Sequence, residues 1–271
     1  MSEQATITGS TRLLAIVGDP IAQVRSPVIY NPRLLNAGQN AVLLPVHLPV
    51  ADFEQGMAGL MRIANLAGLI ITYPFKERAL QFVATVGDVG TQVGAINAMR
   101  RERDGHWSGD MFDGAGLLAA LAGLGQSAAG RRVTLIGAGG AGSAIAMALA
   151  GSGVASLHVH DRVAERASKL AERVTGFYPR CRTSSGSPSL EGSDVLINAT
   201  PVGMAPDFAL VPFQGTLRPN VTVIDIVPSP ETTRLLEMAQ AVGCPTANGQ
   251  AMIAGQADAV LAYLSLLKGA P

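Results

Sequence analysis

The chain has 271 residues, 20 basic and 20 acidic side chains, and a hydrophobic fraction of 48%. This balance gives no overall field to attract nucleic acid or an anionic membrane, and no stretch approaches the ~18 uninterrupted apolar residues of a membrane-spanning helix. Two cysteines, Cys181 and Cys244, make neither a disulfide framework nor a metal-ligand cluster. We therefore expect a cytoplasmic α/β protein without a leader segment in residues 1–6, a membrane anchor or a nucleic-acid partner.

The first 110 residues alternate between short apolar runs and helical patterns. Ser26-Pro27 is typical of a helix start, with serine as the N-cap and proline in the first turn. Asp52 is expected to cap the next helix, short helices are expected within 77–92, and the charged turn 101–105 predicts a hairpin. The predicted strands are 13–17, 41–47, 68–72, 94–99 and 106–108, and the longer helices are 26–36 and 52–65.

The same alternation continues to the end of the chain, which predicts parallel strands with right-handed crossovers. Predicted strands are 133–136, 156–160, 194–198 and 221–226, and predicted helices are 113–124, 143–150, 164–174, 232–242 and a last one ending at 267; residues 183–192 form a variable segment. We expect a first domain over 1–110 and a doubly wound second domain over 111–247. The last helix has no strand after it, so segment 248–271 is expected to pack back on the first domain.

A glycine-rich turn provides the strongest local signal. An apolar strand ends at Gly137-Ala138-Gly139-Gly140-Ala141-Gly142, and a run of helix-forming residues follows. A strand, a glycine turn and a helix N-terminus present backbone N–H groups to a pyrophosphate. Asp161 follows Gly142 by roughly 20 residues, the spacing expected of a carboxylate that binds an adenosine ribose. A plain βαβ turn is the simpler alternative, but the surrounding elements favour a dinucleotide site.

Two charged side chains are candidates for proton transfer. Lys76 follows Thr72-Tyr73-Pro74-Phe75, just past a strand end where ligands of open α/β sheets gather. A lysine in a partly desolvated cleft can exchange a proton with a hydroxyl, although a lone lysine is more often simply solvated. Asp113 is at a helix start, where an aspartate is commonly an N-cap; beside an amine it would instead orient and polarise that group.

Seven motifs occur in order along nearly the whole chain: 18–27, Thr72–Lys76, 94–97, Asp113–116, 137–142, 198–204 and 255–257. Together they resemble the shikimate/quinate dehydrogenase family. The resemblance implies hydride transfer between a nicotinamide and a ring secondary alcohol, with Lys76 and Asp113 as the catalytic pair. It further implies that Ser26, Thr72, Asn97 and Gln256, with Val24 at a serine position, surround the substrate. The implied cofactor contacts are Gly137, Ala138, Gly139, Gly140, Ala141, Asp161, Arg162, Thr200, Pro201, Ile226 and Gly249.

Several positions depart from the pattern of that family. One of the two serines that normally hold the substrate carboxylate is Val24, and the other is Ser26. Polar residues of the pattern are also replaced by Ile70, Met111, Phe112 and Pro228. A missing hydroxyl donor weakens carboxylate binding by roughly 1.5–3 kcal/mol where nothing replaces it. We hypothesise a shikimate-like or less polar cyclic alcohol as substrate; neutral drift at positions that line the site only in part is the alternative.

The residues after the second strand of the glycine-loop unit bear on the cofactor. Asp161-Arg162-Val163 stands where NADP-preferring relatives usually have Asn-Arg-Thr. A carboxylate accepts from a ribose 2′-OH and repels a 2′-phosphate, which predicts NAD over NADP. Arg162 leaves NADP open, because a guanidinium can pair with that phosphate.

No metal site is expected, since His158 and His160 lack a third ligand. A quinate dehydrogenase is the runner-up within enzymes. A non-catalytic NAD(P)-binding regulator is the alternative from another class, and it has no need of the set Lys76, Asp113, Asn97 and Gln256. We expect a small-molecule substrate and a monomer or homodimer.

Overall fold

A computed structural model describes residues 7–213 and 215–267, so the predicted features of residues 1–6 and 268–271 lie outside it. The chain divides into two compact units. The first comprises the residues up to Phe112 together with those from Ala257 onward, and the second runs from Asp113 to Gln256. No helix among the described residues is long and apolar enough to cross a membrane.

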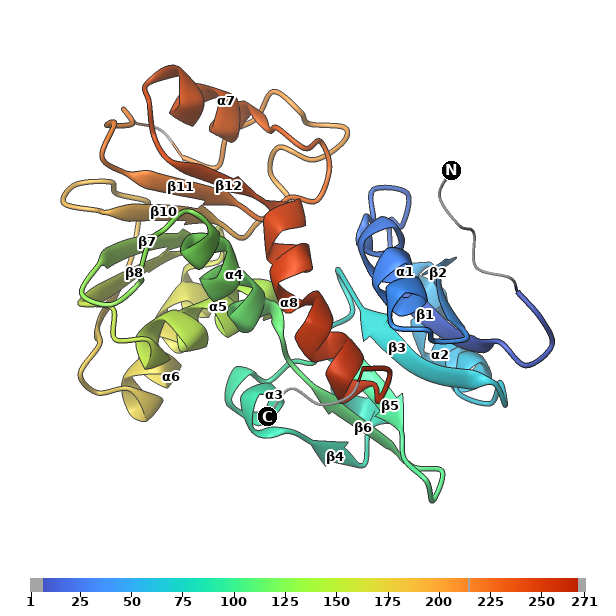
Figure 1. The fold of residues 1–271 in the computed structure, drawn as a ribbon. Coiled ribbons are helices and arrows are strands. Elements are labelled where there is room, and N and C mark those ends of the chain that lie inside the picture. Colours follow the sequence, from blue (N-terminus) through green and yellow to red (C-terminus); the bar gives the residue numbers. More distant parts are fainter. Residues whose placement is uncertain (1–6, 214, 268–271) are drawn as a thin grey trace. The chain divides into compact units, whose positions relative to one another are not determined.

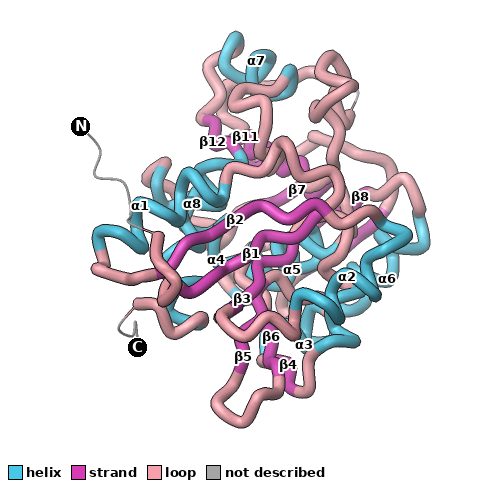
Figure 2. The backbone as a smooth tube through the Cα atoms, turned by 90° about the vertical axis from the view of Figure 1, so that its right-hand side faces the viewer, coloured by secondary structure: helices cyan, strands magenta, loops and turns pink. Residues whose placement is uncertain are grey.

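The first unit is built on a mixed six-stranded sheet of order β2-β1-β3-β5-β6-β4. Figure 2 shows β2, β1 and β3 side by side; they are parallel, whereas β5 is antiparallel to both β3 and β6. The predicted hairpin is therefore confirmed as β5–β6. The elements are β1 Arg12–Gly18, α1 Ser26–Asn36, β2 Ala41–His47, α2 Phe53–Leu60, β3 Leu66–Ile71, β4 Thr85–Val86, α3 Asp88–Val93, β5 Ala98–Arg101 and β6 Trp107–Asp110, with 3₁₀ turns at Val50–Asp52 and Arg78–Phe82.

Some expected boundaries in this unit are wrong. Arg25, not Ser26, is the N-cap of α1, and Ser26 is already the first helical residue. The proline in the first turn sets the helix start without a side-chain cap. The helix expected to end near residue 65 ends at Leu60, and a turn leads into β3. The two-residue strand β4 was not predicted, because its pairing with β6 has no local pattern.

The second unit is a parallel six-stranded sheet of order β12-β11-β10-β7-β8-β9. The chain starts at the centre with β7, moves outward through β8 and β9, and returns to build β10, β11 and β12, which is the doubly wound order. Figure 1 shows α4, α5 and α6 on one face of this sheet and α7 on the other. The elements are α4 Asp113–Gly123, β7 Arg132–Ile136, α5 Gly140–Gly151, β8 Ser156–His160, α6 Ala164–Phe177, β9 Arg182–Ser185, β10 Val195–Asn198, β11 Thr222–Asp225, α7 Arg234–Ala241, β12 Thr246–Asn248 and α8 Gly249–Tyr263.

Both outer strands of this sheet were missed from the sequence. β9 overlaps the start of the segment expected to be variable, and β12 was expected only as the approach to the last helix. Each is short and carries polar residues, so neither shows the apolar run of a buried central strand. The predicted α/β class with a doubly wound second sheet is confirmed.

The last helix belongs to both units. α8 starts in the second unit, and its residues from Ala257 onward belong to the first. In the first unit, Arg100 donates to the carbonyl of Tyr263 at 3.1 Å and Arg33 pairs with Asp258 at 3.1 Å. The helix ends at Tyr263 rather than at residue 267.

Candidate active site and cofactor site

One edge of the first-unit sheet collects most of the predicted substrate residues. β1 and β3 are parallel, so their carboxyl ends lie together, with Val17 beside Ile71. β5 runs the opposite way, and its first residue, Ala98, pairs with Ile70 of β3. The segments after β1 and β3 and before β5 therefore meet at this edge, which we call the substrate edge. It brings together the loop with Val24 and Ser26, the segment Thr72–Lys76, and Asn97.

The backbone of Lys76 is held from two sides. The neighbouring Phe75 is fully buried, and its ring stacks on Phe53 with centroids 3.9 Å apart. The amide of Ile96 donates to the carbonyl of Lys76 at 3.0 Å. Lys76 itself is half-buried. An anchored backbone with a partly desolvated side chain is what a positioned proton-transfer group requires.

Thr72 and Asn97 are fixed to neighbouring segments of the same edge. The amide of Thr72 donates to the carbonyl of Val17 at 2.9 Å. A Cβ on Gly18 would collide with the side chain of Thr72, which explains the glycine at the end of β1. The side-chain oxygen of Asn97 accepts from the amide of Phe112 at 2.9 Å, and Asn97 is 3% exposed. This contact places the amide nitrogen, a donor, on the opposite side of the group.

The loop after β1 holds the two positions expected to face a substrate carboxylate. Ser26 is buried at the start of α1. Val24 is half-buried in the preceding turn, where its amide donates to the carbonyl of Ile21 at 3.1 Å. The Gln23 side chain donates to the carbonyl of Pro20 at 2.6 Å. Val24 thus leaves an apolar side chain in a loop built by backbone contacts.

The other departures from the family pattern have packing roles in the structure. Ile70 is buried in β3 and Met111 is buried after β6. The ring of Phe112 packs on Tyr263 of α8, with centroids 5.3 Å apart. Pro228 is half-buried after β11. Ile70, Met111 and Phe112 therefore support the neutral alternative, and the hypothesis of a less polar pocket rests chiefly on Val24.

Asp113 and Gln256 lie beside the crossing of α4 and α8 within the second unit. A Cβ on Gly116 would be 2.5 Å from the carbonyl of Met252, and one on Gly255 would be 2.7 Å from Ala119. Small residues at both positions therefore allow the helices to touch. Asp113 lies three residues before Gly116 and so on the same face of α4. Asp113 is 1% exposed and Gln256 is 6% exposed.

The glycine loop has the geometry of a dinucleotide cradle. Gly137 has φ of +108°, which favours glycine, and a Cβ there would be 2.7 Å from the carbonyl of Ala199. A Cβ on Gly142 would collide with the carbonyl of Gly137, whereas one on Gly139 would meet nothing within 4 Å. Gly139 is the N-cap of α5, so the space in front of it lies at a helix N-terminus. The loop residues fit a bound pyrophosphate.

Asp161 lies at the end of β8, beside this loop. One carboxylate oxygen accepts from the amide of Ala138 at 2.8 Å, and the other accepts from the amide of Val163 at 2.9 Å. Each oxygen of a carboxylate has a second lone pair, so Asp161 can also accept from a ribose hydroxyl. Arg162 and Val163 are exposed next to it. The hydrogen bond between the Asp161 carboxylate and the amide of Ala138 in the glycine loop was not predicted.

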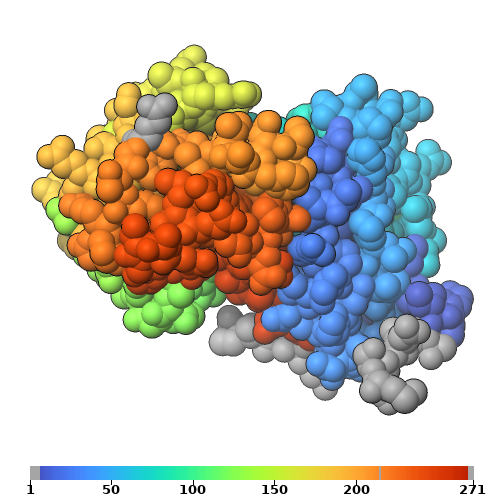
Figure 3. Space-filling model, turned by 90° about the horizontal axis from the view of Figure 1, so that it is seen from above, coloured from blue at the N-terminus to red at the C-terminus, as the bar shows by residue number. Residues whose placement is uncertain are grey.

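The remaining predicted cofactor residues follow the other strands of the sheet. Thr200 and Pro201 come after β10, Ile226 comes after β11, and Gly249 comes after β12. A Cβ on Gly249 would be 2.5 Å from the carbonyls of both Ile226 and Val227, so this glycine permits close backbone packing. The segment between β10 and β12, orange to red-orange in Figure 3, forms a surface of the second unit. All these loops leave the carboxyl ends of parallel strands, where ligands of such sheets bind.

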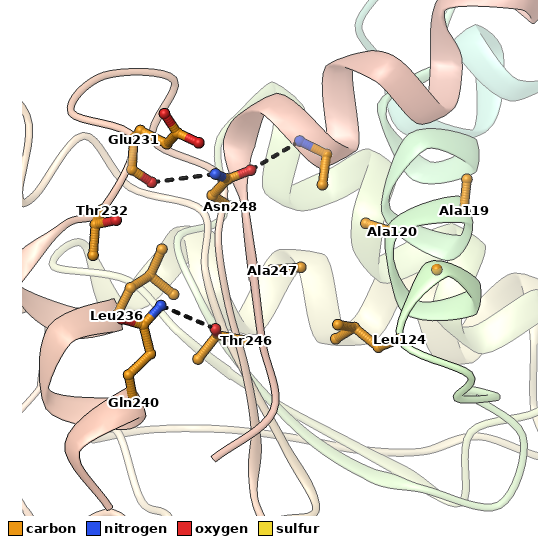
Figure 4. Close-up of a pocket in the computed structure, with 12 residues that line it drawn as sticks. Ala119, Ala120, Leu124, Glu231, Thr232, Leu236, Gln240, Thr246, Ala247 and Asn248 are labelled. Carbon is orange, nitrogen blue, oxygen red and sulfur yellow. Dashed lines mark hydrogen bonds between the residues drawn. The ribbon is translucent and has the colours of Figure 1, made fainter. Parts of the chain in front are cut away.

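A separate pocket of about 460 Å³ lies between α4, α7 and β12 (Figure 4). Asn248 donates to the carbonyl of Glu231 at 3.3 Å and accepts from the amide of Ala251 at 3.0 Å, and Gln240 donates to Thr246 at 3.3 Å. These contacts tie its polar side chains to one another and to the backbone. None of the predicted site residues lines this pocket.

Histidine and cysteine side chains give no metal centre in the described part of the chain. His158 contacts the hydroxyl of Ser184 at 2.9 Å and His160 contacts the carbonyl of Gly186 at 2.8 Å, so both hold the segment around β9. Cys181 and Cys244 are free and buried, and burial raises the pKa of both thiols.

The chain combines a doubly wound sheet that has a glycine cradle with a second sheet whose substrate edge carries Thr72, Lys76 and Asn97. This combination defines a dinucleotide-dependent oxidoreductase. Comparison with known proteins narrows this class. Residues 16–99 match the family model for the shikimate dehydrogenase substrate binding domain, and residues 120–205 match that for shikimate / quinate 5-dehydrogenase. The chain belongs to the shikimate/quinate dehydrogenase family.

Individual relatives cover almost the whole chain. A shikimate dehydrogenase (NADP(+)) of Symbiobacterium thermophilum is 33% identical over 96% of this chain and 91% of its own length. The structure of shikimate 5-dehydrogenase from Listeria monocytogenes with shikimate and NAD has a TM-score of 0.83 at 28% identity, covering 98% of this chain and 94% of that chain. A ligand-free 5-ketofructose reductase of Gluconobacter sp. has a TM-score of 0.80 at 27% identity, covering 94% and 92%.

Proposed function

We propose that this enzyme oxidises a ring secondary alcohol of the shikimate type, or a close analogue, and reduces the ketone in the reverse direction. The observation that carries the proposal is the substrate edge, where Thr72, Lys76 and Asn97 are each fixed by backbone contacts. The first unit would hold the substrate and the second the cofactor. The same set of residues argues against a non-catalytic regulator, because such a protein needs no proton-transfer group.

Oxidation of a secondary alcohol removes a hydride from carbon and a proton from oxygen. The nicotinamide supplies the hydride acceptor when it is bound in the second unit. Lys76 takes the proton from the hydroxyl oxygen through its Nζ and returns it in the reverse direction. Asp113 is proposed as the partner that orients this amine, on the strength of the matching motif Asp113–Gly116. Thr72, Asn97 and Gln256 would hold the remaining substrate hydroxyls.

Val24 offers a direct test of the substrate pocket. Replacing Val24 by Ser restores the hydroxyl that would donate to a substrate carboxylate. We expect kcat/KM for shikimate to rise by about tenfold or more, because a hydrogen bond to a charged group contributes ~1.5–3 kcal/mol. Initial rates with shikimate measure the effect, and Val24→Thr serves as a hydroxyl-bearing variant closer in shape to valine. An unchanged kcat/KM in both variants would refute this model of the pocket.

A substrate without a carboxylate is the second candidate. The apolar Val24 at a serine position favours it, and the Gluconobacter enzyme, named for the neutral sugar 5-ketofructose, has a similar fold. In that case the natural substrate is a less polar cyclic alcohol. The wild-type enzyme then has a low kcat/KM for shikimate, and Val24→Ser raises it. A quinate dehydrogenase remains the alternative among carboxylate substrates.

NAD is the proposed preferred cofactor. The Asp161 carboxylate lies at the end of β8, where the 2′-phosphate of a bound NADP would meet like charge. We expect kcat/KM with NAD to exceed that with NADP by at least about tenfold, equivalent to ~1.4 kcal/mol. Initial rates at alkaline pH with shikimate and quinate, each with both cofactors, test this preference together with the substrate class. A higher kcat/KM with NADP would assign Arg162 to the phosphate and reverse the preference.

We place the enzyme in the cytoplasm, with a small-molecule substrate as its partner. The free, buried thiols of Cys181 and Cys244 are compatible with a reducing compartment. We expect a monomer or a homodimer.

A further inference from the structure

A buried polar network joins the ends of β10 and β11 in the second unit. Asn198 is the last residue of β10 and Asp225 the last of β11, and the two are neighbours in the sheet. Thr233 is the N-cap of α7, and its hydroxyl accepts from the amide of Leu236 at 3.4 Å. Asn198 is fully buried, and Asp225 and Thr233 are each 1% exposed. We call these three residues the strand-end network.

The Asp225 carboxylate is surrounded by donors. One oxygen accepts from the side-chain amide of Asn198 at 2.9 Å and from the amide of Val227 at 3.1 Å, and the other accepts from the hydroxyl of Thr233 at 2.6 Å. These described contacts all come from neutral groups. Burial outweighs them and raises the pKa of Asp225 to about 6. Burying a carboxyl group without a cation beside it costs folding free energy. We therefore expect a role of Asp225 beyond stability.

Asn198 passes this contact on to the loop after β10. Its side-chain oxygen accepts from both the amide and the hydroxyl of Thr200, at 3.0 and 2.6 Å. Its side-chain nitrogen donates to the carbonyl of Val202 at 3.1 Å as well as to Asp225. The oxygen serves two donors, so the nitrogen must face Asp225 and Val202. Asp225 therefore acts together with Thr200 and Val202 to fix which way the amide of Asn198 points.

The segments held in this way are those that carry predicted cofactor contacts. Asn198 binds Thr200 directly, and Pro201 lies between Thr200 and Val202, the other residue that Asn198 binds. Ile226 donates its amide to the carbonyl of Asn198 at 3.1 Å. The loop also borders the glycine cradle, because a Cβ on Gly137 would be 3.0 Å from the side chain of Thr200.

We propose that Asp225 is a positioning residue for the cofactor: through Asn198 it sets the conformation of residues 199–202 against the bound dinucleotide. The inference rests on the proposed function, since it requires that these residues contact NAD or NADP. Among the contacts of the described residues, Asp225 reaches this loop through Asn198 and so acts on the ligand indirectly. Residues that do not touch a ligand can in this way hold the residues that do touch it in the geometry that binding requires.

Three variants test the proposal, with Kd for NAD and NADP measured by calorimetry. Asp225→Ala removes the acceptor, and Asn198→Ala removes the link to the loop while Asp225 keeps Val227 and Thr233. We expect each to raise the cofactor Kd at least tenfold and to leave KM for shikimate within twofold. Asp225→Asn keeps an oxygen for Asn198 and is expected to restore Kd to within threefold of the wild type. Asn198→Ala also carries the test where Asp225→Ala does not fold.

A matched control separates positioning from loss of stability. Thr134 is 2% exposed, and its hydroxyl contacts that of Ser193 at 2.6 Å and the carbonyl of Ser189 at 2.7 Å, so neither contact is with residues 199–202. Thr134→Val removes buried hydrogen bonds of the same kind, so we expect a lower Tm and an unchanged cofactor Kd. Amide exchange without cofactor is expected to speed up at Thr200 and Val202 in Asn198→Ala and not in Thr134→Val.

The outcomes distinguish a failure of the positioning role of Asp225 from a failure of the proposed function. If the wild-type protein binds the cofactor and Asp225→Ala and Asn198→Ala bind it with the same Kd, the inference is overturned and the proposed function stands. An equal rise of Kd in Thr134→Val also overturns it, because general destabilisation would then account for the effect. A wild-type protein that binds neither NAD nor NADP overturns the proposed function and the inference with it.

Discussion

Replacement of Lys76 by Ala should reduce kcat by a factor of about 10²–10⁴, the usual contribution of a positioned acid–base group. The fixed backbone of Lys76, between the buried ring of Phe75 and the amide of Ile96, means that truncation removes the amine without moving the segment. Cofactor affinity should stay within about twofold, because the glycine cradle belongs to the other unit. Steady-state kinetics and a cofactor titration measure the two quantities separately.

Two further variants decide what the amine contributes. Lys76→Arg keeps the positive charge, but a guanidinium does not give up a proton in proteins, so we expect it to be nearly as inactive as Lys76→Ala. Lys169→Ala is the matched control: Lys169 is exposed and forms an i,i+4 pair with Glu165 at 2.6 Å, which raises its pKa. Its loss should leave kcat unchanged. Full activity in Lys76→Arg would mean that charge, and not proton transfer, is what the site needs.

The second large effect concerns Gly142. We expect Gly142→Ala to lower the unfolding free energy by several kcal/mol and to abolish measurable cofactor binding, because its Cβ would overlap the carbonyl of Gly137. The colliding atom belongs to the backbone, so relief requires the whole turn between β7 and α5 to move. Chemical denaturation with linear extrapolation measures the first quantity, and a cofactor titration the second.

Gly139 in the same loop separates folding from binding. A Cβ there meets no atom of the protein within 4 Å, and the backbone φ of −79° suits any residue. Gly139→Ala should therefore keep the wild-type stability to within ~1 kcal/mol, because the gain from a less flexible unfolded chain and the loss of a preferred N-cap residue act in opposite directions. It should still raise the cofactor Kd at least about tenfold, because the methyl group would stand where the pyrophosphate approaches the backbone. Unimpaired binding in Gly139→Ala would place the pyrophosphate elsewhere.

The parts of this protein that follow from local chemistry could be predicted from the sequence. The glycine loop, the strand before it and the helix after it need only contacts between residues close in the chain, and all three lie where expected. The hairpin of β5 and β6 is local in the same sense. β9 and β12 are strands because a neighbouring strand presents free backbone groups to them, and that neighbour is invisible in a short polar segment.

The strand-end network shows a second limit. Asn198 and Asp225 face each other because β10 and β11 are adjacent and in register, which no pattern within either strand records. Phe112 gives a related case. Its replacement of a polar residue suggests a less polar substrate pocket, but its ring packs on Tyr263, a residue far along the chain. A substitution reveals a change in chemistry, and only the fold shows whether a ligand or another side chain meets it.

The shared helix α8 has a consequence for how the protein is made. Residues up to Phe112 leave the ribosome first, but their unit also includes the chain from Ala257 onward, where Leu264 and Leu266 are buried. The entire second unit is therefore synthesised before the first can close its core, and closure joins ends separated by a loop of more than a hundred residues. The apolar surface of the first unit therefore stays exposed until the residues after Ala257 have been synthesised.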